Sequence, residues 1–590
     1  MPASVSTELD CQRAMLFSAR LRISHETQPV REMAIDRILE RNLLVGYSED
    51  GLTLSEIEQL NSNCEIGILP FINNKNDLRK SLERLVNEKK VIKKRTLNKT
   101  KYWLSKDSLE ELRNVLRDTE KRFERVVDRH FNFIKNGSAY YKAPFLECLC
   151  IVFSKLGEDY VHILRGETSS LELQTNPIVT DAIKAIISEH PSIDEDLFKK
   201  EVLRFFQECD PDCDEIKWNM AQNYYIAKAL GIDPSGHLLS KEVIGNSTFF
   251  LDTNIVIDAL DPESEHFESY KAFSNACKQL EIKLKLCKIS LKELESVIRI
   301  KREMIEKVSE QIPDETAGKI DGTIYKLFRE QKCVPNKASV ENVLKRFDKP
   351  IDKLSDIHKV ELVDDPWFEK AGSAKETIEL VTKIKNEYQN KVGRAKWDSS
   401  ALHDALLMQW VQQERKKDDR TWLLTLDTSL PHYSLSQTDG ISQKPLAITL
   451  DVLLQWLSPL TTFTKEVSYE DSASIFADAL KYHLIPRDKF LDLRDFIIFA
   501  EMDWQCKELP PDDVEKCISY LKKDFSNLDP SRPDDRNKMA RQIAKFFADP
   551  SRRYKEDKKR LEDENKSLKN DNTNLRSEIA ELKHTVNIIN

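Results

Sequence analysis

Short apolar runs that alternate with helical segments between residues 248 and 457 constrain the fold of this chain more than any other feature of its sequence. Their length and β-like composition indicate strands. They cover residues 248–251, 283–289, 422–426 and 445–449. Strands that alternate with helices form a parallel sheet flanked by helices, and ligands bind beyond the carboxyl ends of its strands. The sequence therefore predicts a central α/β domain.

Four acidic side chains occupy related places in this pattern. Asp252 and Asp427 directly follow strands, and Glu293 lies one helical turn past another. Asp404 begins a helix that could lie alongside, so we expect all four to meet at the carboxyl edge of the sheet. Converging carboxylates repel in a cleft of low dielectric, and a bound divalent cation is one usual remedy. Oxygen ligands suit Mg²⁺ or Mn²⁺, which are the expected cofactors.

The segments that carry these acids resemble the four acidic blocks of PIN-domain nucleases. They read, in chain order, FFLDTNIVIDAL, ISLKELESV, ALHDALLMQWV and WLLTLDTSL. The resemblance covers about residues 245–459, with a long helical insert at 299–396 that the smallest family members lack. It implies an αβα sandwich whose acids hold one or two metal ions that hydrolyse phosphodiesters.

The resemblance also implies residue roles. All four acids would be catalytic metal ligands, with Asp252 at the centre of the cage. Asn254 and Thr425 lie in the matching segments and would be polar supports that orient a carboxylate or a metal-bound water. Metal ions bridged by carboxylates can supply the nucleophilic water and neutralise the phosphate, which is the chemistry that hydrolysis needs.

Each acid also has a purely structural explanation. Ser290 and Glu293 match a capping box at a helix start. Asp252 and Asp427 could be helix N-caps, and Asp404 an ordinary first-turn acid favoured by the helix dipole. The occurrence of all four in the matching order favours the metal site.

Three neighbouring residues compete for roles in this site. Asp398 and Glu295 could replace or supplement the assigned ligands. Glu295 should point away from Glu293, because residues two apart do not share a helix face. We interpret His403 as a packing or hydrogen-bonding residue, since a metal-activated water needs no histidine as its base.

The N-terminal segment follows the order of a winged helix-turn-helix, with helices, a turn at Gly51 and two β-like runs before residue 106. Residues 75–106 contain twelve lysines and arginines against three acids. Such an excess fits contacts with nucleic-acid phosphates, and a solvated face on a protein-binding module is the alternative. The basic residues singled out for nucleic-acid binding are Lys89, Lys90, Lys93, Lys94, Arg95, Lys99 and Lys101.

A heptad repeat marks the C-terminal segment. Its d positions are Leu561, Leu568, Leu575 and Leu582, and its a positions are Asn565, Asn572, Ile579 and Val586. Leucine at d with asparagine and β-branched residues at a favours a parallel two-stranded coiled coil. We therefore expect a homodimer through residues 554–589.

The whole chain is expected to be multidomain and mostly α, because 590 residues exceed one compact core and only 14 glycines and 22 prolines occur. The expected domains are a winged-helix-like module (1–106), a helical domain (107–244), the PIN-like domain (245–459), a helical connector (460–549) and the coiled coil (550–590). No signal peptide or membrane segment is recognisable, which predicts a cytoplasmic protein. Its eleven cysteines should be reduced thiols.

These features together predict a metal-dependent endonuclease of RNA or single-stranded DNA. The PIN resemblance further suggests a toxin or anti-phage defence effector. The chain has no phosphate-binding G-x-x-x-x-G-K-[ST] loop, so any ATPase would be a separate regulatory partner. The alternative function is a winged-helix DNA-binding regulator or scaffold with an inactive PIN-like domain.

Overall fold

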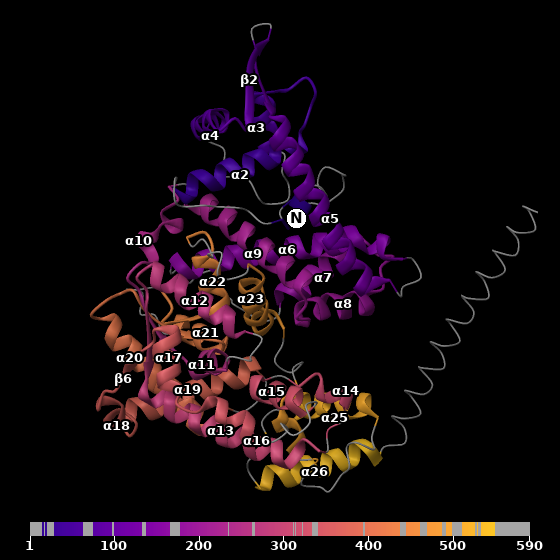
Figure 1. The fold of residues 1–590 in the computed structure, drawn as a ribbon. Coiled ribbons are helices and arrows are strands. Elements are labelled where there is room, and N and C mark those ends of the chain that lie inside the picture. The colour runs from indigo at the N-terminus through magenta and orange to yellow at the C-terminus, as the bar shows by residue number, and fades with distance from the viewer. Residues whose placement is uncertain are drawn as a thin grey trace, which may run out of the picture. The chain divides into compact units, whose positions relative to one another are not determined.

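The chain folds into two compact units in the computed structural model (Figure 1). The first comprises Met1–Glu306 and Ile320–Leu493, and the second Lys307–Lys319 and Arg494–Asn590. The residues that the structure describes are 14–16, 18–19, 29–62, 75–96, 99–132, 137–165, 177–233, 235–261, 266–310, 312, 314–320, 322–332, 340–392, 396–436, 444–460, 469–485, 491–497, 499, 510–525, 528 and 533–548. As expected, these residues are mostly helical and include a parallel sheet.

The parallel sheet has five strands in the order β6-β5-β4-β7-β8. Their bounds are Thr248–Leu251 for β4, Lys283–Cys287 for β5, Glu361–Val363 for β6, Thr421–Thr425 for β7 and Ala447–Thr449 for β8. All neighbouring strands pair in parallel. The four strands expected from the sequence are therefore confirmed.

Strand β6 corrects the expectation that residues 299–396 are only helical. It extends the sheet beside β5 and lies inside that segment. Glu361 and Leu362 are both exposed, so its three residues lack the alternation of buried and exposed positions that would have indicated a strand.

The order of the strands contains a topological switch point, which is where ligands bind in open parallel sheets. β4 is central, with β5 and β6 following on one side and β7 and β8 on the other. The chain thus reverses its direction of travel across the sheet between β4 and β7. In open parallel sheets a crevice forms at such a switch point, beyond the carboxyl ends of the two strands.

Helices cover both faces of this sheet. Successive side chains of a strand point to opposite faces. Leu423 packs in a core cluster with residues of α20 (Asp398–Arg415), whereas the ring of Trp422 lies 6.0 Å from that of Trp456 on α22 (Leu450–Leu457). All five residues of β7 are buried, as expected for a central strand between two helical layers.

Further helices of the first unit surround these layers. Their bounds are α10 Lys241–Ile244, α11 Thr253–Leu260, α12 Phe267–Gln279, α13 Lys288–Val308 (which continues into the second unit), α15 Thr323–Lys332, α16 Val340–Leu344, α17 Pro350–His358, α18 Trp367–Ala371, α19 Lys375–Val392, α21 Ser429–Ser436 and α23 Tyr469–Leu484. α23 contacts α12 and also α9 (Pro211–Ile232), so part of the segment expected to be a connector belongs to the first unit.

A helical array precedes the sheet in the chain. It contains α5 Lys106–Phe131, α6 Ser138–Arg165, α7 Pro177–Glu189, α8 Glu195–Gln207 and α9 Pro211–Ile232. α6 and α9 approach closely at Gly157, where an added Cβ would lie 2.9 Å from the carbonyl carbon of Tyr224. The hydroxyl of Tyr160 donates to Oδ2 of Asp451 at 2.5 Å and so ties α6 to α22.

The N-terminal segment forms a small module with three helices and an antiparallel sheet. Its elements are α2 Val30–Val45, β1 Leu52–Thr53, α3 Leu54–Ser62, α4 Lys75–Asn87, β2 Val91–Thr96 and β3 Lys99–Leu104. The strand order is β1-β3-β2, and β2 extends beyond the three helices in Figure 1. The two β-like runs of the sequence are thus a paired hairpin, and β1 is a strand that the sequence did not indicate.

The second unit is helical where it is described. It contains α14 Asp314–Ala317, α25 Pro511–Asp524 and α26 Pro533–Ala548. Lys319 pairs with Glu515 at 2.7 Å, and the rings of Tyr520 and Phe546 lie 5.6 Å apart. The predicted coiled coil lies outside the described residues.

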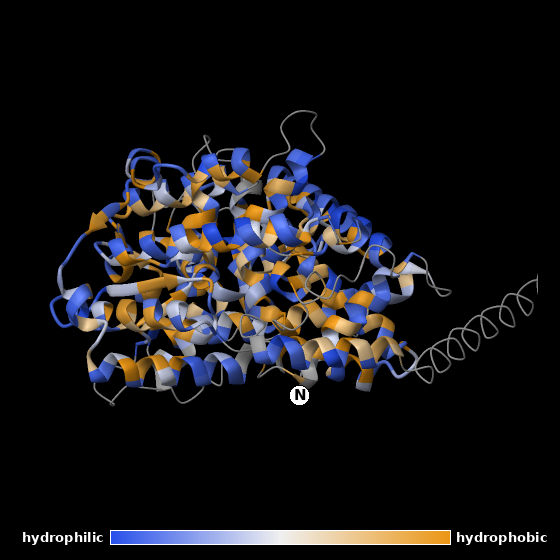
Figure 2. Ribbon diagram, turned by 90° about the horizontal axis from the view of Figure 1, so that it is seen from below, coloured by the Kyte–Doolittle hydropathy of each residue, from blue (hydrophilic) through white to orange (hydrophobic). Residues whose placement is uncertain are grey.

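The helices that the structure describes alternate apolar and polar residues rather than forming long apolar stretches (Figure 2). Figure 2 shows polar residues interrupting apolar ones along them. Within the described ranges, every helix is too short or too polar to cross a bilayer. Cys148, Cys150, Cys209 and Cys213 are free thiols.

Candidate metal centre

Two of the predicted acids flank the switch point of the sheet. Asp252 directly follows β4 and caps α11, because its Oδ1 accepts the Thr253 N–H at 2.6 Å. Asp427 follows β7, and its Oδ1 accepts from the backbone N–H of Ser429 at 2.9 Å and from the Ser429 hydroxyl at 2.6 Å. The capping explanation for Asp252 is therefore correct, but it leaves Oδ2 of this residue directed elsewhere.

Asn254 and Thr425 hold the second oxygen of Asp252. The Thr425 hydroxyl donates to Oδ2 at 2.6 Å, and the Asn254 amide donates to the same oxygen at 2.8 Å. Thr425 Oγ1 also accepts the Asp427 N–H at 2.9 Å, and Asn254 Oδ1 accepts the Leu426 N–H at 3.0 Å. These bonds join the ends of β4 and β7, so the two residues lie where polar supports were expected.

Glu293 reaches the same place from α13. Its Oε2 accepts from the Thr253 hydroxyl at 2.7 Å, and its Oε1 accepts from the Ser400 hydroxyl at 2.6 Å. Ser290 lies inside α13 rather than before it, and its hydroxyl is 3.0 Å from Nε2 of His403. The capping-box explanation for Ser290 and Glu293 is therefore wrong.

Asp404 lies beyond the first turn of α20, whose first-turn acid is Asp398. The helix-dipole explanation for Asp404 is therefore wrong as well. Its Oδ1 is 3.3 Å from Nδ1 of His403. The competing acids lie elsewhere: Asp398 is exposed and pairs with Lys385, and Glu295 is also exposed.

His403 connects two of the acids. Its Nδ1 lies 2.7 Å from Oε2 of Glu293 and 3.3 Å from Oδ1 of Asp404, so one ring nitrogen faces both carboxylates. The ring is buried. The hydrogen-bonding interpretation of His403 agrees with these contacts, but the sequence did not indicate that its partners would be the candidate ligands.

Lys396 is the residue that sequence reasoning missed. Its ammonium contacts Oδ2 of Asp404 and, at 2.6 Å, Oδ2 of Asp427. Its side chain is only 9% exposed and lies 4.7 Å from the centre of the Tyr388 ring. A lysine just before a helix carries no signal in a sequence rich in lysine, and Lys396 lies at the end of the expected insert at 299–396.

Burial makes the charge of Asp252 costly. Loss of solvation is the main cause that raises the pKa of Asp252, and the nearby charge of Asp404 adds to it. The pKa reaches about 7, although the hydrogen bond from Thr425 opposes the shift. A carboxylate in this state gains from any cation that can approach it.

Asp427, His403 and Glu293 are held in their charged forms. Burial opposes ionisation of Asp427, but Lys396 outweighs it and lowers the pKa of Asp427 to about 2. Burial likewise opposes charge on His403, but Glu293 and the hydrogen bonds raise its pKa to about 10. The pKa of Glu293 is lowered despite burial, chiefly by the imidazolium.

The donor set fits a hard divalent cation. Asp252, His403 and Asp404 each offer one ligand atom, and these atoms lie within 4.8 Å of one another. Glu293 and Asp427 adjoin this group through His403 and Lys396. Carboxylate oxygens favour Mg²⁺ or Mn²⁺. His403, held as the imidazolium, has no free lone pair for a metal and adjoins the site as a hydrogen-bond partner of two acids. All four predicted acids thus belong to one connected cluster.

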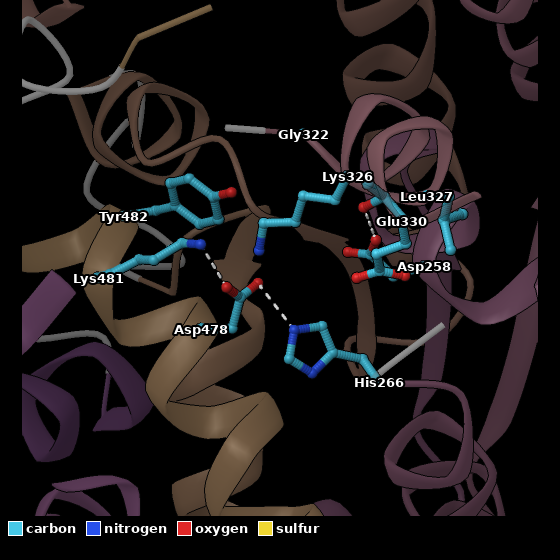
Figure 3. A pocket seen from close by; sticks show the side chains of 10 residues that line it. Asp258, His266, Gly322, Lys326, Leu327, Glu330, Asp478, Lys481 and Tyr482 are labelled. Carbon is cyan, nitrogen blue, oxygen red and sulfur yellow. Dashed lines mark hydrogen bonds and ion pairs between the residues drawn. The ribbon is translucent and has the colours of Figure 1, made fainter. Parts of the chain in front are cut away.

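A second polar cluster lies between α11, α12, α15 and α23 (Figure 3). Lys481 and His266 are both directed at Asp478, at 3.8 Å for the histidine, and Asp258 accepts from the Thr323 hydroxyl. The hollow between them measures about 30 Å³, enough for about two water molecules and too small for a nucleotide. Two lysines and a histidine face three carboxylates there, so we interpret the cluster as a link between helices.

Among the residues that the structure describes, two further groups of side chains could hold a metal ion by position. One is His130, Glu208 and Cys213, and the other is Glu147, Glu189 and His190. In the first, Arg129 lies 4.0 Å from the Cys213 sulfur, and this fixed cation disfavours a metal. Neither group lies at the switch point of the sheet.

The basic residues of the N-terminal module divide into two groups. Lys90 pairs with Glu88 at 2.9 Å, and Lys101 donates to the carbonyl of Asp50 at 2.8 Å, so both have internal partners. Lys89 is exposed beside the hairpin. The exposed basic residues of β2 and β3, which we call the basic hairpin, are Lys93, Lys94, Arg95 and Lys99.

The chain matches no family model, and comparisons with curated proteins and with solved structures also find no match.

Proposed function

We propose that this protein is a PIN-like, divalent-metal-dependent endonuclease that hydrolyses phosphodiester bonds of RNA or single-stranded DNA. One observation carries the proposal: four acids from distant parts of the chain belong to one connected cluster at the switch point of a parallel sheet. Asp252 and Asp404 lie in one group of possible ligands, and Glu293 and Asp427 join it through His403 and Lys396. The resemblance of the four acidic segments to PIN-domain nucleases supports the same activity.

Mg²⁺ or Mn²⁺ is the proposed cofactor. The residues that would hold it are Asp252, Glu293, Asp404 and Asp427. Such an ion supplies an activated water and neutralises charge on the scissile phosphate. The chain fixes the central ligand in advance, because Asn254 and Thr425 both donate to its Oδ2. Preorganised ligands of this kind lower the cost of assembling a site at the moment of reaction.

The basic hairpin supports nucleic acid as the partner. Its four cations are exposed on adjacent strands, where they can neutralise phosphates without contacting bases.

The proposal includes a winged-helix-like role for this module, homodimerisation through residues 554–589 by the heptad repeat, and a separate regulatory or ATPase partner. It places the enzyme in the cytoplasm as a toxin or anti-phage defence effector, following the PIN resemblance.

Cleavage assays test the activity. Full-length protein is incubated with end-labelled RNA and single-stranded DNA in Mn²⁺, in Mg²⁺ and in EDTA. We expect cleavage only with metal, reduced at least about a hundredfold by Asp252→Asn. Asp398→Asn is the matched control, because Asp398 is an exposed acid on the helix that carries Asp404. Metal-independent cleavage, or full activity of Asp252→Asn, would disprove the proposal.

The second candidate is a DNA-binding regulator or scaffold with an inactive PIN-like domain, which the exposed basic hairpin favours. It predicts tight binding of duplex DNA with no cleavage of either substrate. Binding and cleavage measured on the same preparation therefore separate the two functions.

A further inference from the structure

Lys396 places a positive charge inside the acidic cluster, and this charge bears on how a metal ion could enter. The following inference rests on the proposed metal site. The Lys396 ammonium contacts Oδ2 of Asp404 and Oδ2 of Asp427, one from α20 and the other from the end of β7. Its side chain is nine-tenths buried, so water does little to screen these contacts.

The two oxygens that Lys396 contacts are those that a metal ion would need. Oδ1 of Asp427 accepts two hydrogen bonds from Ser429, and Oδ1 of Asp404 faces the imidazole of His403. The Oδ2 atoms therefore remain as the donors of this acid pair. A lysine ammonium and a divalent ion cannot both lie between the same two oxygens, because both are cations that need close contact with them.

A lysine ammonium can be displaced from two carboxylates by a metal ion more easily than an arginine could. Its charge is carried on a flexible four-carbon chain and makes no fixed bidentate geometry. The ring of Tyr388 on α19 lies 4.7 Å from the ammonium, and an aromatic face attracts a cation. A displaced ammonium can thus keep one favourable contact after it leaves the carboxylates.

We infer that Lys396 is a built-in counter-ion that occupies the cation position between Asp404 and Asp427, and that a divalent ion binds there only by displacing its ammonium. The lysine stabilises the metal-free fold by pairing two buried acids. It also weakens metal binding, because the ion must first displace the ammonium from both carboxylates. Loss of the charge should therefore change stability and metal affinity in opposite directions.

Mn²⁺ titration calorimetry on the full-length protein, freed of metal with EDTA, measures the affinity. We expect Lys396→Met to bind Mn²⁺ about tenfold more tightly than the wild type, or more, since competition from one unit charge at contact distance exceeds the roughly 1.4 kcal/mol that corresponds to tenfold. Lys396→Arg, which keeps the charge and adds a bidentate fork, should bind Mn²⁺ no more tightly than the wild type. Lys385→Met is the matched control, because Lys385 pairs with the exposed Asp398 instead.

Thermal unfolding gives a readout that does not depend on activity. In EDTA, Lys396→Met should unfold at a lower temperature than the wild type, and Mn²⁺ should remove most of this difference. A variant that binds Mn²⁺ no more tightly than the wild type would overturn the inference, as would one that binds no Mn²⁺ at all.

A measurement on the wild type keeps the test independent of any folding defect in the variants. Acetylation of Lys396 by an amine-reactive reagent, followed by mass spectrometry, should increase when Mn²⁺ is added, because displacement exposes the ammonium. Unchanged or reduced acetylation would overturn the inference. Mn²⁺-dependent acetylation without nucleic-acid cleavage would uphold the counter-ion and refute the nuclease, so the two failures are distinguishable.

Discussion

Raising the pH from 6 to 8 should strengthen Mn²⁺ binding about tenfold, because the ion competes with a proton for Asp252. Burial and the charge of Asp404 raise the pKa of Asp252 to about 7. With this pKa, about 9% of the carboxyl is ionised at pH 6 and about 91% at pH 8. An aspartate with an ordinary pKa would be ionised at both values, and its contribution to metal binding would not change.

The contribution of Asp252 to the folding stability of the metal-free protein changes with pH in the opposite direction. The pKa of Asp252 in the folded state lies above its ordinary value of 3.8, so the folded state binds this proton more tightly than the unfolded chain does. The resulting stability is fully present below about pH 4 and is lost as the pH rises through about 7. Mn²⁺ should therefore stabilise the protein more at pH 8 than at pH 6.

Titration calorimetry at pH 6, 7 and 8, in two buffers of different ionisation enthalpy, yields both the affinity and the number of protons released. Proton release should be greater at pH 6 than at pH 8 by nearly one proton per ion. Asp252→Asn should remove this difference, and Asp398→Asn should retain it. Equal affinity at pH 6 and pH 8 in the wild type would refute the reasoning.

Three further predictions concern packing and binding. Thr425→Val should lower the melting temperature in a calorimetric scan, because it removes a hydrogen bond to Asp252 and leaves the partly buried N–H of Asp427 without its acceptor, at a cost of about 1–3 kcal/mol. Thr382→Val, at an exposed threonine, should have little effect in the same scan. Gly157→Ala should destabilise the α6–α9 contact by about 1–3 kcal/mol, whereas Gly231→Ala, where an added Cβ has no atom within 4 Å, should be neutral or stabilising in thermal melts. Replacing the basic hairpin by alanines should weaken nucleic-acid binding and flatten its salt dependence in fluorescence anisotropy; an unchanged slope would place the contact elsewhere.

The sequence by itself determined four of the five strands of the central sheet and the neighbourhood of the acids that follow them. Apolar runs mark strands through their local pattern, and the carboxyl ends of parallel strands share one edge. Asp252 and Asp427 directly follow two such strands, so their proximity follows from topology alone. Asn254 and Thr425 were identified through the resemblance of their segments, and their hydrogen bonds to one oxygen agree with the expected placement.

The tertiary structure decided which other charges enter the site. Lys396 lies thirty-one positions from Asp427 in the sequence, and no local pattern predicts that its ammonium contacts that acid. The pairing of His403 with Glu293 likewise depends on how α20 packs beside α13. Periodicity reports which face of an element is buried, whereas the partner of a buried charge depends on the packing of elements far apart in the chain, which only the folded molecule reveals.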